Sequence, residues 1–260
     1  MNEMISRAGR CNCVRWSVLI AGLAVLIGLL WYVIIAHRGS AAGRESVTTL
    51  PPSGLVSWWP GEGDGNDAVG ANNGVVPDSV TFAEGKVGRA FSFALGNREC
   101  RDFDEIHIPR FAWKLPTSEI TVEFWQKVDS VRSQYSLITS GRTDANLFTV
   151  SAPWRDGKIY FEFGSPNSLS YLPPVSIVGT WQHLACVASQ TGDFMKIYRN
   201  GALEAQRIGM TPFANSMSDL RLGYCITGLL DEVRIYNRAL SASEILFIYN
   251  ANSTNIAGAK

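Results

Sequence analysis

Three pairs of residues in this sequence combine an aromatic ring with a charged group two positions apart, in segments of alternating polarity. The six residues are Glu123 and Trp125, Tyr160 and Glu162, and Arg234 and Tyr236. Side chains two positions apart point to the same face of a strand, and we expect this face to be the outward one. An aromatic ring beside hydrogen-bonding groups suits a sugar, which presents apolar C–H faces and polar edges. The pattern therefore makes these six residues candidates for ligand binding.

The same alternation has a simpler explanation. Strands of a β-sandwich carry polar residues on their outward faces, and aromatic rings there often pack against cross-strand neighbours. Loops at the rim of a sheet carry much of the specificity of a binding site, and alternation does not give their positions. Ligand binding and cross-strand packing are both compatible with the pattern.

The acidic residues do not have the spacing of a hydrolase site. Glycoside hydrolases need two carboxylates, about 5–9.5 Å apart, on either side of the scissile bond. On one strand such carboxylates would alternate as in E-x-D-x-E, a string that the sequence lacks. Asp102, Asp104 and Glu105 come closest, but their spacing divides them between two faces. G-x-S-x-G and H-E-x-x-H are also absent. We therefore expect no catalytic residues and no enzyme activity.

The elements that must position the candidate residues are short strands. Charged residues make up 18% of the chain, and glycine and aromatic residues are plentiful, which is typical of an all-β domain with many turns. In the hairpin over residues 195–208, Asn200-Gly201 suits the positive φ angles of a type I′ turn. The succession of strands predicts an all-β fold, a two-sheet antiparallel jelly-roll sandwich. The predicted strands cover residues 55–58, 74–76, 90–93, 105–108, 120–128, 135–138, 147–151, 158–163, 181–188, 195–208 (a hairpin), 220–224 and 229–236.

The segment that closes the domain has the most specific pattern. Residues 229–236 alternate as a half-buried strand. Ser241 and Glu244 then form a capping box, S-x-x-E, which begins a short helix carrying Ile245 and Ile248.

This closing strand resembles the last strand of LamG-like jelly-roll domains, which belong to the concanavalin A-like lectin superfamily. Other segments resemble the same family in its order and spacing, and together they cover residues 54–249. The resemblance implies a jelly-roll fold, and it implies ligand binding on the concave sheet and its rim loops. These segments are GLVSWWPGEGDGNDAVGANNGVV, GKVGRAFSF, ITVEFW, GTWQHLACVAS and MKIYRNGALEA.

The resemblance also implies a structural calcium ion between the opening loop and the closing strand. Asp67 matches the family's loop aspartate, and Asp231 matches the aspartate that opens the closing strand. Asn72 and Glu62 are further candidate ligands. Calcium takes six to eight oxygens, and a glycine-rich loop supplies carbonyls as well as carboxylates. The loop residues equally fit ordinary turns, in which Asp and Asn side chains bond to nearby backbone groups.

The N-terminal part of the chain predicts a membrane anchor. Residues 16–36 are 21 residues without a charge, and at ~1.5 Å per residue a helix of this length spans the ~30 Å hydrocarbon core. Arg7, Arg10 and Arg15 precede it, which favours a cytoplasmic N-terminus. We predict a cytoplasmic segment 1–15, a transmembrane helix 16–36, a linker 37–53, a jelly-roll domain 54–250 and a flexible tail 251–260. The domain would then be periplasmic or extracellular.

A cleaved signal peptide is the alternative for the same segment. Ser40-Ala41-Ala42 is a candidate small-residue cleavage site. The apolar run is longer than the apolar core of about 7–15 residues that signal peptides usually have, which favours the anchor.

Two of the five cysteines are candidates for a disulfide. Cys100 and Cys225 each lie just outside a predicted strand, and an oxidising compartment would permit a bond between them. Cys186 lies on the same strand face as Leu184 and is predicted to be a small core residue.

The zero net charge gives no indication of a nucleic-acid partner. Two functional hypotheses from different classes follow. The first is a non-catalytic, membrane-anchored extracytoplasmic module that recognises carbohydrate or a protein partner through the concave sheet and rim loops. The second is a structural or interaction protein of the cell envelope that has no glycan ligand.

Overall fold

The computed structural model describes residues 51–94, 104–111, 118–139, 148–164, 166–212 and 218–253. All of them belong to one unit, Leu50–Lys260. The predicted cytoplasmic segment, the transmembrane helix and the linker up to residue 50 lie outside the described residues. Within the described ranges, no helix combines the length and the apolar character needed to cross a bilayer.

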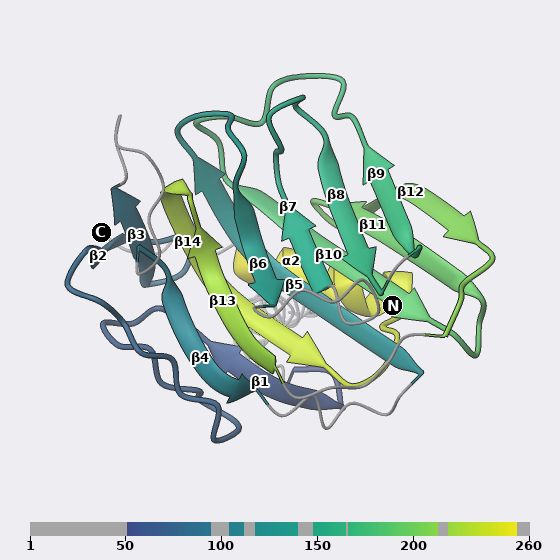
Figure 1. Ribbon diagram of the computed structural model, residues 1–260, viewed down its shortest axis with the longest axis horizontal. Coiled ribbons are helices and arrows are strands. Elements are labelled where there is room, and N and C mark those ends of the chain that lie inside the picture. The colour runs from purple at the N-terminus through teal and green to yellow at the C-terminus, as the bar shows by residue number, and fades with distance from the viewer. Residues whose placement is uncertain are drawn as a thin grey trace, which may run out of the picture. The chain divides into compact units, whose positions relative to one another are not determined.

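Two antiparallel sheets stack as the layers of a sandwich (Figure 1). The eight-stranded sheet has the order β12-β11-β10-β5-β14-β3-β2, and β1 pairs with β14 beside this path. The six-stranded sheet has the order β4-β13-β6-β7-β8-β9. This arrangement confirms the predicted all-β, two-sheet antiparallel sandwich.

The strands of the eight-stranded sheet are β1 (Leu55–Trp59), β2 (Val80–Glu84), β3 (Arg89–Ala94), β5 (Glu119–Val128), β10 (Gln182–Ser189), β11 (Phe194–Arg199), β12 (Ala202–Ile208) and β14 (Thr227–Tyr236). Those of the six-stranded sheet are β4 (Ile106–Phe111), β6 (Tyr135–Thr139), β7 (Phe148–Ser151), β8 (Ile159–Phe163), β9 (Ser168–Tyr171) and β13 (Ser218–Tyr224). Helix α2 (Ala242–Ser253) follows the last strand.

The main core lies between the sheets and is built from large apolar side chains. On β5, the predicted inward residues Ile120, Val122 and Phe124 are fully buried in it. Trp59 contributes from β1 and contacts Phe111 of β4, with ring centroids 6.0 Å apart. The alternation read from β5 is therefore confirmed for its inward face.

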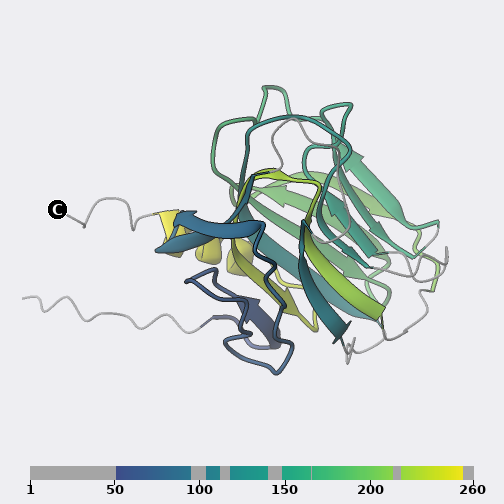
Figure 2. The ribbon, with the colours of Figure 1, turned by 60° about the vertical axis from the view of Figure 1, so that its left-hand side comes forward.

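Helix α2 covers the outer face of the eight-stranded sheet, on the side away from the six-stranded sheet (Figure 2). Its capping box forms as predicted, because the Glu244 N–H donates to Ser241 Oγ at 3.3 Å and the Ser241 N–H donates to Glu244 Oε2 at 2.8 Å. Ile245 and Ile248 are buried against Tyr236 in a second, smaller apolar cluster. One sheet therefore has both of its faces covered, whereas the six-stranded sheet has no such helix among the described residues.

The hairpin of β11 and β12 has the predicted turn. Asn200 has a φ of 50° and Gly201 a φ of 79°, the left-handed values that a type I′ turn requires. A Cβ at Gly201 would also lie 2.8 Å from Leu246 of α2, so the turn needs a glycine for two reasons.

The structure differs from the predicted elements in four places. Strands β2 and β9 were not predicted, and residues 74–76 contribute only a single bridge, between Val75 and His107. Helix α2 continues to Ser253, so it includes the start of the predicted tail.

Candidate functional site

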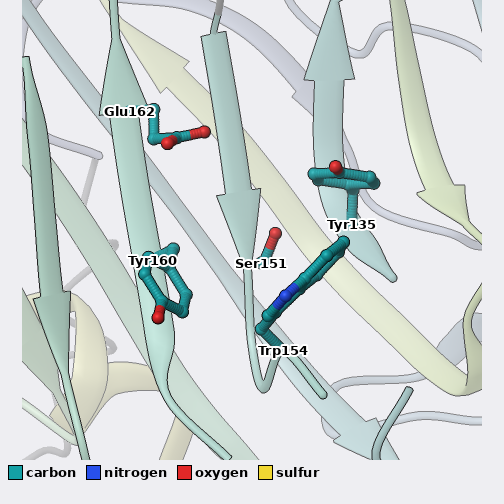
Figure 3. A pocket seen from close by; sticks show the side chains of 5 residues that line it. All are labelled: Tyr135, Ser151, Trp154, Tyr160 and Glu162. Atoms are coloured by element: carbon teal, nitrogen blue, oxygen red, sulfur yellow. The ribbon is translucent and has the colours of Figure 1, made fainter. Parts of the chain in front are cut away.

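A pocket of about 280 Å³ lies on the outer face of the six-stranded sheet. This volume is just below the ~300 Å³ at which small-molecule pockets usually begin. Tyr160 and Glu162, two of the six candidates found by alternation, line it. The described lining residues come from β6, β7, β8 and the β7–β8 turn, and are Tyr135, Ser151, Trp154, Tyr160 and Glu162 (Figure 3).

Strand pairing builds the floor of the pocket. Ser151 of β7 is opposite Tyr160 of β8, and Thr149 is opposite Glu162. Cross-strand partners share a face, so these four side chains point outward while Phe161 points into the core. The Thr149 hydroxyl donates to Glu162 Oε2 at 2.8 Å. This bond holds the carboxylate in place, and Oε1 accepts no hydrogen bond from the described part of the chain.

The turn between β7 and β8 carries Trp154 to the rim of the pocket. The Trp154 N–H donates to the Lys158 carbonyl and the Gly157 N–H donates to the Trp154 carbonyl, both at 2.7 Å. Gly157 has a φ of 82°, a conformation that favours glycine. Asp156 Oδ1 accepts a further bond from the Lys158 N–H at 3.0 Å. These bonds close the turn and so fix the backbone position of Trp154.

Three aromatic rings form the walls of the pocket. Trp154 contacts Tyr135, with ring centroids 5.1 Å apart and planes inclined by 50°. Tyr160 stands on the other side of Ser151 (Figure 3), and its hydroxyl donates to Asp156 Oδ2 at 2.6 Å. This hydrogen bond lowers the pKa of Asp156 and raises the pKa of Tyr160, because it stabilises the carboxylate and keeps the phenol protonated.

The lining determines what the pocket can do chemically. The rings offer apolar faces for stacking, the Ser151 hydroxyl can donate or accept a hydrogen bond, and Glu162 supplies an acceptor. Among the described lining residues Glu162 is the one carboxylate, whereas glycoside hydrolysis uses two. The arrangement suits a ligand with an apolar face and several hydroxyl groups.

The other four candidates do not reach this pocket. Glu123, Trp125, Arg234 and Tyr236 lie on the eight-stranded sheet and are buried, with exposed fractions of 0%, 2%, 7% and 0%. The structure thus divides the six residues between two sheets, which corrects the expectation that they present one exposed binding face.

The buried four take part in an internal network. Glu123 accepts hydrogen bonds from Arg234 Nη1 on Oε1, at 2.9 Å, and from His183 Nε2 on Oε2, also at 2.9 Å. Burial by itself raises the pKa of Glu123, but Arg234 and His183 outweigh it, so the pKa lies below its usual value. The Trp125 ring packs between His183 and Tyr249, with centroids 5.2 and 5.6 Å away. These contacts correspond to the cross-strand packing alternative.

Helix α2 is the physical reason for the difference. Its residues Ile245 and Ile248 are buried, and the face of the sheet that covers them is the one that carries Trp125 and Tyr236. The capping box predicts this helix from the sequence, so it could also have been predicted that a helix covers one outer face of the sandwich. Trp154 had no such signal, because it lies in a turn where strand alternation does not apply.

The candidate calcium ligands Asp67 and Asn72 form a loop motif of their own. Asp67 Oδ1 accepts the backbone N–H groups of Trp58, Val69 and Gly70 at 2.9, 3.1 and 2.9 Å, and Oδ2 accepts that of Asn72 at 3.2 Å. Burial raises the pKa of Asp67, but the N–H groups of Gly70, Trp58 and Val69 outweigh it and lower the pKa. A carboxylate filled with N–H donors is a turn former, so Asp67 does not fit as a calcium ligand.

Asp231 has different surroundings. Its Oδ2 accepts the backbone N–H groups of Lys86 and Val87 at 2.7 and 3.0 Å, and the exposed Glu62 accepts that of Arg89 at 3.1 Å in the same β2–β3 turn. Asp231 Oδ1 is buried without a hydrogen-bond partner. Burial, with a smaller contribution from Glu62, raises the pKa of Asp231 to about 7.

An unpartnered buried carboxylate oxygen beside a second carboxylate fits a cation. Over the described ranges, however, no group of three or more His, Cys, Asp or Glu side chains is arranged to hold a metal ion. Asp231 and Glu62 therefore fit calcium only together with backbone or water oxygens.

The described cysteines have distinct states. Cys225, in the turn between β13 and β14, is disulfide-bonded. Cys100, its predicted partner, lies outside the described residues. Cys186 is a free, fully buried thiol on β10, as predicted for a core residue, and burial raises its pKa.

Comparison with known proteins adds a family and a set of similar folds. A sequence model of the concanavalin A-like lectin/glucanases superfamily matches residues 102–246. No match to the chain was found among curated proteins.

Several solved structures are similar to the chain. Domain 4 of AbnA, an extracellular GH43 arabinanase from Geobacillus stearothermophilus, in complex with arabinotriose, shares 20% identity at a TM-score of 0.62, over 75% of this chain and 98% of that chain. The binding domain of Paraclostridial mosquitocidal protein 1 shares 16% identity at a TM-score of 0.59, over 76% of this chain and 52% of that one. The botulinum neurotoxin serotype G binding domain shares 16% identity at a TM-score of 0.60, over 77% and 51%. The chain spans about half the length of these two toxin domains, and the likeness at such identities is one of fold.

Proposed function

Because the chain belongs to the concanavalin A-like lectin/glucanases superfamily, we propose that it is a non-catalytic binding module that recognises carbohydrate through the pocket on its six-stranded sheet. The observation that carries this proposal is the convergence of Trp154, Tyr135 and Tyr160 around Ser151 and Glu162. One similar domain was solved with arabinotriose, and two others are binding domains, which supports a binding role.

The rigidity of the pocket supports the same function. The closed β7–β8 turn holds Trp154, and the bond to Asp156 holds the hydroxyl of Tyr160. Groups fixed before binding lose little conformational freedom when the ligand arrives, so more of the contact energy appears as affinity.

The absence of catalysis is part of the proposal. Glu162 is the one carboxylate that the described part of the chain contributes to the pocket, and the sequence lacks the acidic strings and hydrolase motifs that catalysis would need.

A glycan array followed by affinity measurement on the full chain tests the carbohydrate proposal. Trp154→Ala should weaken binding of any sugar that the wild type retains by at least about tenfold, because the lost ring contact is worth ~1.5 kcal/mol. Phe247→Ala is the matched control, since it removes an exposed ring from α2 on the other sheet.

Equal sugar binding by Trp154→Ala and wild type would reject the pocket as the site. Absence of binding to every glycan, together with an envelope protein that co-purifies with the chain, would instead favour a structural or interaction protein without a glycan ligand.

We also propose a structural calcium ion, held by Asp231 and Glu62 rather than by Asp67 and Asn72. The ion would supply the positive charge that the buried Asp231 Oδ1 lacks, and so fasten the β2–β3 turn to β14. This proposal rests on the family resemblance and on the unpartnered oxygen.

Thermal unfolding with calcium and with a chelator distinguishes the two aspartates. Calcium should raise the melting temperature of the wild type, since a ligand of the native state stabilises it. Asp231→Asn should abolish this increment. Asp67→Asn should lower the melting temperature equally with and without calcium. An increment that survives in Asp231→Asn would contradict the assignment.

For location, we propose that residues 16–36 anchor the protein in a membrane and that the sandwich lies outside the cytoplasm. The length of the uncharged run supports the anchor. The disulfide at Cys225 supports an oxidising compartment, because cytosolic thiols are kept reduced.

A further inference from the structure

We infer that the pocket selects uncharged saccharides over acidic ones, such as uronic acids, and that Glu162 is the residue that sets this preference. The inference rests on the proposed carbohydrate-binding function and adds the class of sugar that the site accepts.

The first step is the charge of the lining. Of the five described residues that line the pocket, Glu162 is the one with an ionisable carboxyl, and the others are two tyrosines, a tryptophan and a serine. The bond from Thr149 to Oε2 keeps the carboxylate on the pocket side of the sheet. In Figure 3 the carboxylate extends from β8 toward β7, one step along β8 from Tyr160 and at the end of the pocket away from Trp154. A ligand in the pocket meets a negative charge.

The second step is that none of the described lining residues carries a positive charge. Lys158, in the β7–β8 turn, lies 3.9 Å from Asp156 Oδ2, so its charge is balanced by a second carboxylate. Arg155 is exposed on the same turn and is not among the described lining residues. The two cations of this turn therefore do not offset Glu162.

The third step is the direction of the hydrogen bonds. Tyr160 already donates its hydroxyl hydrogen to Asp156, so to a ligand its oxygen can act only as an acceptor. Glu162 Oε1 is also an acceptor. Sugar hydroxyl groups can donate to both, whereas a sugar carboxylate can only accept and has no donor to offer them. An acidic sugar thus loses bonds as well as meeting repulsion.

The repulsion can be given a magnitude. Two carboxylates ~6 Å apart at an effective dielectric constant of ~40 repel by an energy that corresponds to about a tenfold loss of affinity. Because the pocket opens to solvent, this penalty should shrink as salt is added.

The experiment compares matched sugars on the full chain. Each probe is a pair that differs only at C6, such as a galactose trimer and a galacturonate trimer, or a glucose trimer and its glucuronate counterpart. Wild-type protein should prefer the neutral member by about tenfold at low salt, and the ratio should fall in high salt. Glu162→Gln keeps the acceptor for Thr149 and removes the charge, so it should bring the ratio close to one. Glu84→Gln, which removes an exposed charge from β2 on the other sheet, should leave the ratio unchanged.

The outcomes distinguish the preference for uncharged saccharides from the proposed carbohydrate binding on which it rests. Binding that is sensitive to Trp154→Ala but equal for neutral and acidic sugars, or a ratio that Glu162→Gln leaves in place, would overturn the inference and keep the proposed function. Binding of no probe, or binding insensitive to Trp154→Ala, would overturn both. Should Glu162→Gln fail to fold, the salt dependence of the wild-type ratio decides the matter.

Discussion

Asp67 and Asp231 are the same residue type in opposite surroundings. Asp67 accepts backbone N–H groups of its own loop and of the preceding strand β1, which lower its pKa. Asp231 accepts two from a distant turn and keeps one buried oxygen without a partner, and its pKa is raised to about 7. A sequence match assigned both to one ion. The two pKa values differ because different backbone groups surround each carboxylate, and the residue type alone does not predict those groups.

The raised pKa of Asp231 predicts that stability depends on pH when calcium is removed. The pKa is about 7 in the folded domain, against the ordinary aspartate value of 3.8 that applies to an unfolded chain. The folded state therefore retains a proton that the unfolded state releases between these values, so stability is highest at low pH and falls as pH rises from about 4 through 7. The total loss is at most ~4 kcal/mol, since each pKa unit corresponds to ~1.4 kcal/mol.

Urea unfolding at pH 5 and at pH 8 in a chelator measures this effect. Asp231→Asn carries a neutral amide in place of the protonated acid, so its stability should change less between the two pH values than that of the wild type. The same pH dependence in Asp231→Asn and wild type would show that another group is responsible.

At the site, some residues could be predicted from the sequence and others could not. Tyr160 and Glu162 were found because β8 obeys strand alternation and its outer face is open. Trp125 and Arg234 obey the same alternation but are covered, so the pattern gave their face correctly and their exposure wrongly. Trp154 enters the pocket through turn geometry, which alternation cannot describe.

Strand β14 and helix α2 show how one element changes the meaning of another. The strand leaves the sheet at Tyr236, and the helix that follows returns across the sheet's outer face. Polar and aromatic residues on that face become an internal network in which Glu123 joins Arg234 and His183. The six-stranded sheet keeps its outer aromatic residues available for a ligand because no helix among the described residues covers them.

The capping box at Ser241 and Glu244 is expected to contribute to the stability of helix α2 on the sheet. Ser241→Ala removes the oxygen that accepts the Glu244 N–H and also the hydroxyl that donates to Glu244 Oε2 at 2.8 Å. The free energy of unfolding should fall by ~1 kcal/mol, the usual cost of losing such a cap. Ser241→Thr retains a hydroxyl and is the control. Denaturant titration measures both variants, and equal losses in the two would mean that the hydroxyl does not act as a cap.

For the whole molecule, local patterns predicted the architecture better than the boundaries. The type I′ turn at Asn200 and Gly201 and the capping box at Ser241 were found because a few neighbouring residues determine them. Strand β9 was missed because its four residues bury one side chain, Leu169, which gives no clear alternation. The sheet order depends on contacts between distant segments, and no local pattern predicted it.

The disulfide at Cys225 links the fold to the compartment in which the protein matures. Cys225 lies in the turn that joins the last two strands of the sandwich. Cytosolic reductants would keep this cysteine as a thiol, whereas an exported domain would hold it oxidised. Acid quenching of cells, followed by alkylation and non-reducing electrophoresis, should therefore show a mobility difference between wild type and Cys225→Ser. In the purified protein, a reductant should lower the stability of the wild type by roughly 2–5 kcal/mol and leave that of Cys225→Ser unchanged. A thiol at Cys225 in quenched cells would contradict the proposed location. A disulfide that appears only in the purified protein would not support it, because that bond would have formed after the cells were opened.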